Sequence, residues 1–525
     1  MRLSEEKKMA VRMSLKNSFG SMIGVALHIP LNIVSASLLG PVNFGAFKII
    51  GLVQHYASYN HLGLVQAVVR QVPLAMGRGN PEKAEEVKDI CFSGSLVATL
   101  LTIVLLWLLY CFGVSFKGSF DLAIMVMVTF ILIFQRADSL LHNYIKGIGH
   151  FDLIAQRNLY LNNLMPLLSL AFVVIWKLKG LVFGTLITTL ITFIYYFYWL
   201  QPIRFKFKLP LKKLWELLKI GLILFINKTT DGLFWTADLT IIAIMLSRRE
   251  VGLYGFALGS VSVVTGFISM LNMIIYRRIL LERSRAEDTK DFSSFKKYTE
   301  YYLPLLLTIS ALLLGSIFLG YRFLVNVVLS KYRESLPCII LLSFGYLSFV
   351  TRYFTFSFLN ATNQLRYQIL YTLCATALNY GLDYLLIKAG YGIIGVAMGC
   401  TISFVIVSGL MLIHVFHNIY HGFRRGFVHL SKIVVCSALL CSLMYLFSKL
   451  GVSSLGSGGG LLTKIIYHGA DAGFKLLVYL LVCTGLFSLA FRKENLFAKL
   501  RVYAEYTKEI FEEKLGMRRL KNHVH

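Results

Sequence analysis

Charge, acidic residues and proline are all scarce in this chain. Only 15% of its 525 residues are charged and 26 are Asp or Glu, whereas 57% are hydrophobic. A soluble globular domain carries about 25% charged residues, so this composition excludes an ordinary soluble protein. The nine prolines leave long apolar stretches uninterrupted. The chain is therefore expected to be a membrane protein.

Two further absences narrow the function. The eight cysteines form no C-x-x-C pair, which argues against a metal site or a disulfide framework and favours small apolar packing residues. The phosphate-binding pattern G-x-x-x-x-G-K-[ST] does not occur, so the chain is expected not to use ATP. We predict no cofactor, and expect any driving force to come from H⁺, Na⁺ or the membrane potential.

Apolar runs dominate what is present. A helix needs about 20 mostly apolar residues to cross a bilayer. Fourteen segments meet that test, at 17–39, 44–66, 90–113, 121–145, 153–176, 180–200, 220–246, 252–275, 299–320, 336–359, 367–387, 391–416, 433–450 and 471–491. The sequence therefore predicts an all-α integral membrane protein with about 14 transmembrane helices.

The net charge of +27 follows the predicted topology. With both termini in the cytoplasm, 35 of the 53 Lys and Arg fall in inside segments, 11 in outside loops and 7 in spans. This bias indicates a multi-pass protein of the cytoplasmic (inner) membrane that contacts anionic phospholipids, with no nucleic-acid groove. A cleaved signal peptide is the alternative for 17–39, because Ser35 and Ser37 form a small-x-small site. The long charged segment before that span and its full length favour a retained helix.

An internal repeat divides the chain. The pattern Leu-Gly-x-x-x-Phe-Gly at 39–45 recurs as Leu-Ser-x-x-x-Val-Gly at 246–252, and the segment 146–150 corresponds to 360–364 at a similar offset. Two pairs in the same order predict two pseudo-symmetric six-helix lobes, a recurrent transporter plan. The predicted divisions are a cytoplasmic segment 1–16, an N-lobe 17–200, a cytoplasmic linker 201–219, a C-lobe 220–416, two additional helices in 417–491 and an amphipathic cytoplasmic tail 492–525.

Basic residues inside the predicted spans are the strongest functional signal. A cation at the bilayer centre costs roughly 2.5 to 3.5 kcal/mol, so it normally faces a partner or a water-filled cavity. Seven such residues occur: Lys48, Arg136, Arg157, Lys219, Lys228, Arg352 and Lys475. Their presence predicts that the protein moves an anionic molecule.

Depth separates these seven residues. Lys48, Lys219 and Lys475 lie near the ends of their spans, where long side chains reach the membrane surface, and for Arg157 both interpretations stay open. The deeper residues lie roughly 10 to 14 Å from the cytoplasmic ends of their spans and are expected to line a cavity. They are Arg136, Lys228 and Arg352. The alternative is an intramembrane ion pair with an acid of the same helix.

Polar and acidic residues within the spans complete the predicted site. His55, Asn60 and His61 in one span, and Asn162 and Asn163 in another, offer donors and acceptors to sugar hydroxyls, although hydrogen bonds between packed helices are an equal alternative. The acids that could bind a coupling proton or sodium ion are Asp138, Asp231, Asp238 and Asp383. For each acid singly, a structural hydrogen bond is the competing interpretation.

The order of several short motifs resembles a known family. The motifs are Ser-Leu-Leu-Gly-Pro-x-x-Phe-Gly at 37–45, Leu-Gly-Leu at 62–64 followed by Val-Arg at 69–70, and Gly-Asn-x-Glu-Lys-Ala at 79–84. Together with weaker signatures as far as residue 415, they resemble the polysaccharide-exporter and lipid-linked oligosaccharide flippase family of the multidrug, oligosaccharidyl-lipid and polysaccharide exporter superfamily. His61 stands where that family usually has an acid, and fourteen spans are more typical of the lipid II flippases of the same superfamily.

The resemblance implies a flippase, not an enzyme. Such a protein would move a polyprenyl-diphosphate-linked oligosaccharide from the cytoplasmic to the outer leaflet by alternating access, for cell-surface polysaccharide synthesis, with a polymerase or glycosyltransferases as partners. The expected substrate-binding residues are Arg136, Lys228, Arg352, Arg157, Arg70, His55, Asn60, His61, Asn162 and Asn163.

Four alternatives stay open at this point. The first is a lipid II flippase. A membrane glycosyltransferase or polymerase is less favoured because the first outside loop is only 40–43 and no acidic pair lies outside. The others are a cation-coupled drug exporter, whose cavity would favour excess acid, and a non-transporting assembly partner.

Overall fold

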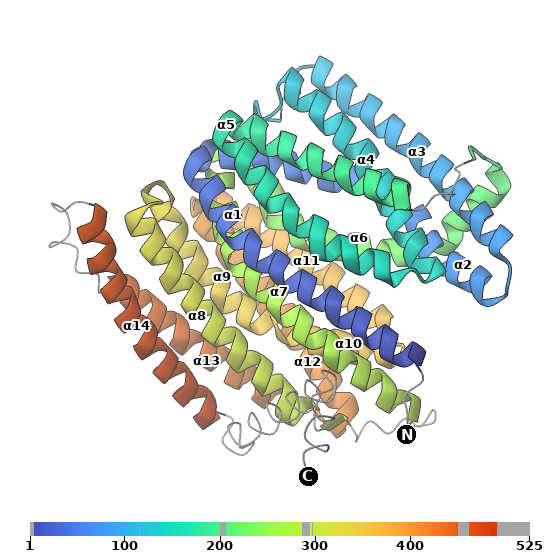
Figure 1. Cartoon of the computed structure of the whole chain (residues 1–525). Helices are drawn as coiled ribbons and strands as arrows, with labels where there is room; N and C mark the ends of the chain where they lie inside the picture. Colours follow the sequence, from blue (N-terminus) through green and yellow to red (C-terminus); the bar gives the residue numbers. More distant parts are fainter. Residues whose placement is uncertain are drawn as a thin grey trace, which may run out of the picture. The chain divides into compact units, whose positions relative to one another are not determined.

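The computed structural model describes residues 5–114, 116–199, 206–285, 295–296, 298–449 and 461–490. These ranges contain helices and no strand (Figure 1), which confirms the all-α prediction. The α-helices are α1 (Glu5–Ala57), α2 (Leu64–Gly77), α3 (Pro81–Cys111), α4 (Leu122–Ile148), α5 (Phe151–Trp199), α6 (Leu211–Met245), α7 (Arg248–Arg285), α8 (Leu303–Val327), α9 (Leu336–Phe349), α10 (Thr351–Ala361), α11 (Leu365–Lys388), α12 (Gly392–Tyr420), α13 (Arg424–Lys449) and α14 (Leu461–Ala490). Short helical turns are η1 (Ser58–His61), η3 (Tyr298–Tyr302) and η4 (Ser330–Ser335).

Backbone breaks reconcile these helices with the fourteen predicted spans. Gly40 interrupts α1 with φ 67° and ψ 171°, and Trp176 and Lys177 interrupt α5. Each of these two helices therefore holds two predicted spans, whereas α9 and α10 share one, at 336–359. Among the described residues, ten stretches are long and apolar enough to cross a membrane, and α6 and α11 are not among them.

Helix starts follow local sequence chemistry. The Asn80 side chain accepts a hydrogen bond from the Lys83 nitrogen at 2.9 Å, with Pro81 at the first helical position of α3. Asp121 caps α4 in the same way through the Ile124 nitrogen at 2.8 Å. These caps satisfy amide donors that a helix otherwise leaves unpaired.

The chain forms two compact units. The described residues of the first unit lie within 1–270, 328–342 and 369–403, and those of the second lie within 271–327, 343–368 and 404–525. In the first unit, α1 packs on α5, α4 packs on α5, and α2 packs on α3 and α4. Apolar side chains of α2, α3 and α4, joined by Leu214, Leu217 and Leu218 of α6, form one of its cores. The predicted lobe boundaries stay a prediction.

The added C-terminal helices pack within the second unit. Helix α14 lies along α8, where Tyr479 rests against Gly315 and its hydroxyl donates to the Ala311 carbonyl oxygen at 2.9 Å. Lys475 does not reach the surface. It is 5% exposed and forms an ion pair with Asp471 at 2.7 Å, one helical turn away. This pairing lowers the cost of placing a lysine at that depth.

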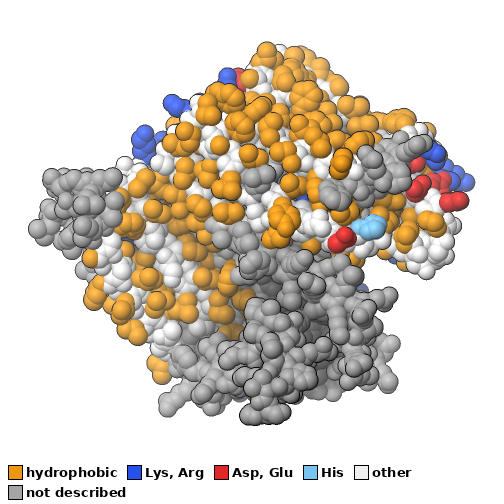
Figure 2. Space-filling view, viewed as in Figure 1, with side chains coloured by type: hydrophobic (Ala, Val, Ile, Leu, Met, Phe, Trp, Pro, Cys, Tyr) orange, Lys and Arg blue, Asp and Glu red, His pale blue; other side chains and the backbone are white. Residues whose placement is uncertain are grey.

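Large apolar side chains cover much of the surface. Leu101 on α3 is 66% exposed, Leu481 on α14 is 64% exposed and Phe474 is 70% exposed. Figure 2 shows one such face, with hydrophobic side chains spread over it and charged side chains gathered toward its edges. An apolar surface of this extent suits lipid and not water.

Candidate functional site

Arg136 lies in α4, is 7% exposed and holds the short turn η1, which separates α1 from α2. Its Nη2 donates to the Ser58 carbonyl oxygen at 2.8 Å and to Asn60 Oδ1 at 2.6 Å, and its Nε donates to Thr99 Oγ1 at 3.3 Å. The Asn60 amide also donates to Thr99 Oγ1 at 3.2 Å and to Thr102 Oγ1 at 3.1 Å. The guanidinium therefore ties η1 to α3 and α4. Its predicted contact with substrate stays a prediction.

The break itself turns polar side chains inward. Leu62 and Gly63 have positive φ, at 46° and 106°, so α1 cannot continue directly into α2. His61 is 4% exposed, and its Nδ1 accepts a hydrogen bond from the Gly63 nitrogen at 3.0 Å. A Cβ built on Gly63 would lie 2.8 Å from the carbonyl carbon of Gly221 in α6. Only glycine meets both the positive φ and this close approach.

A hydroxyl ladder joins α1 to α6. Lys228, Gly232, Thr236 and Thr240 recur at four-residue intervals, which places them on one face of α6. The Tyr56 hydroxyl bonds to Thr236 Oγ1 at 3.2 Å and to Thr240 Oγ1 at 2.6 Å. This face of α6 is therefore held against the last turns of α1.

Gly232 makes room for an aromatic pair beside Lys228. A Cβ at Gly232 would lie 3.2 Å from His55 Nε2 and would overlap the Tyr59 hydroxyl. The Tyr59 hydroxyl bonds to His55 Nε2 at 2.8 Å. Glycine at this position thus allows both rings to lie directly on α6.

Lys228 is exposed even though it lies inside a predicted span. Arg136, His55 and His61 lie near it in the first unit. The result is a basic cluster, formed by these four residues, with hydroxyls and amides around it. Such a cluster suits an anion that brings sugar hydroxyls with it.

Arg157, for which both interpretations were open, forms an ion pair with Asp138 of the preceding helix, α4. Arg157 Nη2 lies 2.7 Å from Asp138 Oδ2. The guanidinium carbon lies 5.3 Å from the centre of the Tyr196 ring, and the Tyr196 hydroxyl bonds to His142 Nδ1 at 2.7 Å. This arrangement joins α4 to α5 and balances both charges.

The other predicted binding residues each have their own surroundings. Arg352, in α10, belongs to the second unit, is 6% exposed and lies 5.1 Å from the centre of the Phe349 ring. Arg70 is exposed on α2. The Asn163 amide donates to its own helix at the Leu159 carbonyl oxygen, at 2.6 Å. The Asn162 side chain lies outside the described ones.

Two of the predicted acids lie together inside the first unit. Asp238 in α6 is 4% exposed and accepts hydrogen bonds from the Tyr254 hydroxyl and, at 2.6 Å, from Asn379 Nδ2. Asp383, one turn beyond Asn379 on α11, is 0% exposed, and neither of its carboxylate oxygens has a hydrogen bond within the described part of the chain. A Cβ at Gly399 would overlap Asp383 Oδ1. Asp231, by contrast, is half-buried.

This acid pair is chemically distinctive. A buried carboxylate without a cation is costly, so it takes up a proton or binds an ion. The described residues contain no group of three or more His, Cys, Asp or Glu suited to a metal ion. Sequence reasoning identified both acids as candidates but not their proximity to each other. The contact between α6 and α11 is a property of the tertiary fold, and residue spacing along the chain does not predict it.

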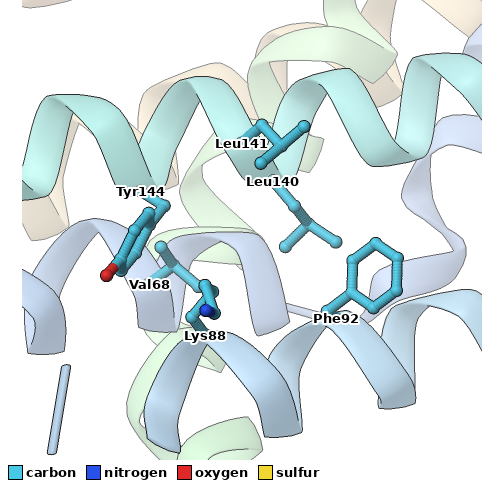
Figure 3. Close-up of a pocket in the computed structure, with 6 residues that line it drawn as sticks. All are labelled: Val68, Lys88, Phe92, Leu140, Leu141 and Tyr144. Atoms are coloured by element: carbon cyan, nitrogen blue, oxygen red, sulfur yellow. The ribbon is translucent and has the colours of Figure 1, made fainter. Parts of the chain in front are cut away.

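A small pocket lies between α2, α3 and α4 (Figure 3), and side chains fill it too tightly for a substrate. Lys88 is 4% exposed there, with its Nζ 3.5 Å from Asp89 Oδ1 and 5.5 Å from the centre of the Tyr144 ring. The lining residues are Val68, Lys88, Phe92, Leu140, Leu141 and Tyr144.

Comparison with solved structures shows a transporter fold. The chain is similar to a structure titled "Lipid II flippase MurJ, inward closed conformation", with a TM-score of 0.57, 12% identity and coverage of 91% of this chain and 99% of that one. It is also similar to an inward-facing multidrug resistance MATE family transporter of the MOP superfamily, with a TM-score of 0.50, 13% identity and coverage of 80% and 95%. At these identities the likeness concerns the fold alone.

Sequence comparison gives the family. No curated protein matches the chain. The model of the family described as "Polysaccharide biosynthesis protein" matches residues 15–276, and its multi-pass helical fold is that of the MOP transporters. The chain belongs to the polysaccharide biosynthesis protein family, as the order of its motifs indicates.

Proposed function

We propose that this protein is a flippase that carries a polyprenyl-diphosphate-linked oligosaccharide from the cytoplasmic to the outer leaflet by alternating access. The observation that carries the proposal is Lys228, an exposed cation inside a predicted span, beside Arg136, His55 and His61. The lipid tail of the substrate can stay in the bilayer, whereas the diphosphate needs cations and the glycan needs polar neighbours.

The geometry suggests distinct roles for these residues. Lys228 supplies a point charge to the diphosphate, because it is an exposed lysine inside a predicted span. Arg136 holds η1 in place and adds positive potential from behind. The His55 and Tyr59 rings offer an aromatic surface and polar edges to a sugar. Arg157, Arg70, Asn163, Asn162 and Arg352 are secondary candidates on this scheme.

Asp238 and Asp383 are the proposed coupling site for H⁺ or Na⁺. Their burial and the unpaired Asp383 oxygens favour them over Asp138, which is neutralised by Arg157, and over the half-buried Asp231. A bound cation would also draw α6 and α11 together, and Lys228 lies on α6. Differential binding of the ion in two states would then bias the helix that carries the substrate cation.

The cellular setting belongs to the same proposal. We place the protein in the cytoplasmic membrane with both termini inside, in contact with anionic phospholipids, and with a polymerase or glycosyltransferases as working partners. Lipid II is the second candidate substrate, favoured by the likeness to the lipid II flippase fold. Both molecules present a diphosphate, so the glycan must distinguish them.

The test is transport in reconstituted vesicles. Vesicles containing a fluorescent polyprenyl-diphosphate oligosaccharide, or fluorescent lipid II, are mixed with a membrane-impermeant quencher with and without the protein. We expect faster exposure of the oligosaccharide lipid and at least about a tenfold loss in Lys228→Ala, the scale of one lost charged contact. Lys219→Ala is the matched control, because Lys219 is an exposed lysine on the same helix beside Trp215. No acceleration with either lipid overturns the flippase, and acceleration with lipid II alone reassigns the substrate.

A further inference from the structure

Two glycines meet at the end of the first unit where the chain turns at Gly40. A Cβ built on Gly45 in α1 would lie 2.9 Å from the Gly252 nitrogen, and closer still to the Arg248 carbonyl oxygen. A Cβ built on Gly252 in α7 would lie 2.9 Å from the Gly45 nitrogen, and closer still to the Pro41 carbonyl oxygen. The two backbones touch, with no room for a side chain on either helix.

The contact is reciprocal across the internal repeat. Adding the repeat offset of 207 to positions 41 and 45 gives 248 and 252. Gly45 lies against the carbonyl group of Arg248, and Gly252 lies against the carbonyl group of Pro41. Pro41 and Arg248 are equivalent residues of the repeat, and so are Gly45 and Gly252. Equivalent residues that touch one another lie on the pseudo-symmetry axis that relates the two halves.

The same relation continues one turn further along the helices. Lys48 corresponds to Gly255 at this offset, and a Cβ at Gly255 would lie 2.9 Å from Lys48 Cγ. Lys48 thus lies along the space left by its own repeat partner, with its Nζ 5.0 Å from the centre of the Phe44 ring. It was expected to be a membrane-surface anchor, but it is half-buried directly behind the glycine contact.

Other contacts fasten the same end. Tyr332 of η4 is 1% exposed, and its ring lies 6.3 Å from Phe44 and 4.6 Å from Phe256. Arg249 makes two hydrogen bonds of 2.8 Å with Glu334, and Arg248 Nη1 donates to the Gly118 carbonyl oxygen at 3.0 Å. These polar contacts are exposed, so water can replace them when the helices part.

We infer that the Gly45–Gly252 contact is the outer gate of the transporter, with Lys48 as the cation behind it. The inference rests on the proposed alternating access and on the predicted topology, which places the turn at Gly40 outside. In the present conformation the gate is shut because two glycines let the backbones meet. When the halves part there, Lys48 meets water and can hold the departing diphosphate.

Cysteine labelling tests the gate without substrate. Intact cells carrying the variant Lys48→Cys are treated with a membrane-impermeant maleimide. The labelling rate of the protein that keeps Lys48 is subtracted as the background from the native cysteines. Adding Gly45→Ala or Gly252→Ala prevents close contact, so we expect labelling to rise on the order of fivefold or more. The matched controls are Gly51→Ala on α1 and Gly259→Ala on α7, where an added Cβ meets nothing within 4 Å.

The outcomes separate the gate from the transport proposal. Because the two glycines make equivalent contacts, each variant is an independent trial, and size-exclusion profiles of the purified proteins test whether both remain folded. Labelling of both folded variants at the rate of the Gly51 and Gly259 controls overturns the gate. Faster labelling of both variants would support the gate. If the unmodified protein then moves no lipid-linked sugar, the gate stands and the flippase proposal is refuted.

Discussion

Replacing Arg136 with alanine is the sharpest test of the site's construction. The guanidinium makes two short hydrogen bonds, to Ser58 and Asn60, and a longer one of 3.3 Å to Thr99. Hydrogen bonds from charged groups contribute about 1.5 to 3 kcal/mol each, so losing the two short ones costs about 3 to 6 kcal/mol. Asn60 keeps its bonds to the α3 threonines, which places the expected loss near the lower end.

Thermal unfolding in detergent measures this loss. We expect Arg136→Ala to melt several degrees below the wild type, and Arg136→Lys to fall between them, because an ammonium group keeps the charge but cannot reach all three acceptors. Arg70→Ala is the control, since Arg70 is an exposed arginine on the adjoining helix, and it should melt with the wild type. Melting of Arg136→Ala at the wild-type temperature, with transport abolished, would refute the bracing role and make Arg136 a substrate ligand.

Three further perturbations have definite expected outcomes. Asp383→Asn should abolish the dependence of flipping on an imposed H⁺ or Na⁺ gradient, because an amide cannot take up the proton or supply the carboxylate charge; an unchanged gradient dependence would exclude this acid. Gly315→Ala should destabilise the fold by about 1 to 3 kcal/mol, because the new methyl overlaps the Tyr479 ring, whereas Gly320→Ala on the same helix meets nothing within 4 Å and should not. Tyr56→Phe removes the bonds to two threonines of α6 and should slow flipping while leaving expression unchanged, and equal rates would show that the ladder is not used.

Hydropathy alone was enough to predict the helical architecture. Each of the fourteen predicted segments overlaps one or more helices of the described chain, because lipid demands a satisfied backbone over about 20 residues and leaves few alternatives. The repeat was visible as well, since Gly45 and Gly252 occupy equivalent positions. Their direct contact was not predictable, because spacing along a chain does not say which helices cross.

The depth of a basic residue along its helix predicted that burying its charge is costly, but not which groups would pair with it. Arg136 finds a carbonyl oxygen, an amide and a hydroxyl on other elements, and Arg157 finds Asp138 on α4. These partners lie on other helical elements, 19 to 78 residues away along the chain. The meeting of Asp238 on α6 with Asp383 on α11 is of the same kind. Such pairings depend on tertiary packing, and a single sequence holds no signal for them.

The basic residues inside the predicted spans differ in their partners, and this difference favours Lys228 as the substrate-binding cation. Arg157 and Lys475 are neutralised by carboxylates, and Arg136 is held by backbone and side-chain oxygens. Each arrangement offsets the cost of a cation inside a membrane, and none leaves the charge available. Lys228 is exposed, and no hydrogen bond or ion pair holds it in the described ranges. A cation at that depth needs water or an anion beside it. An arriving diphosphate could therefore pair with Lys228, whereas the other three cations already have protein partners.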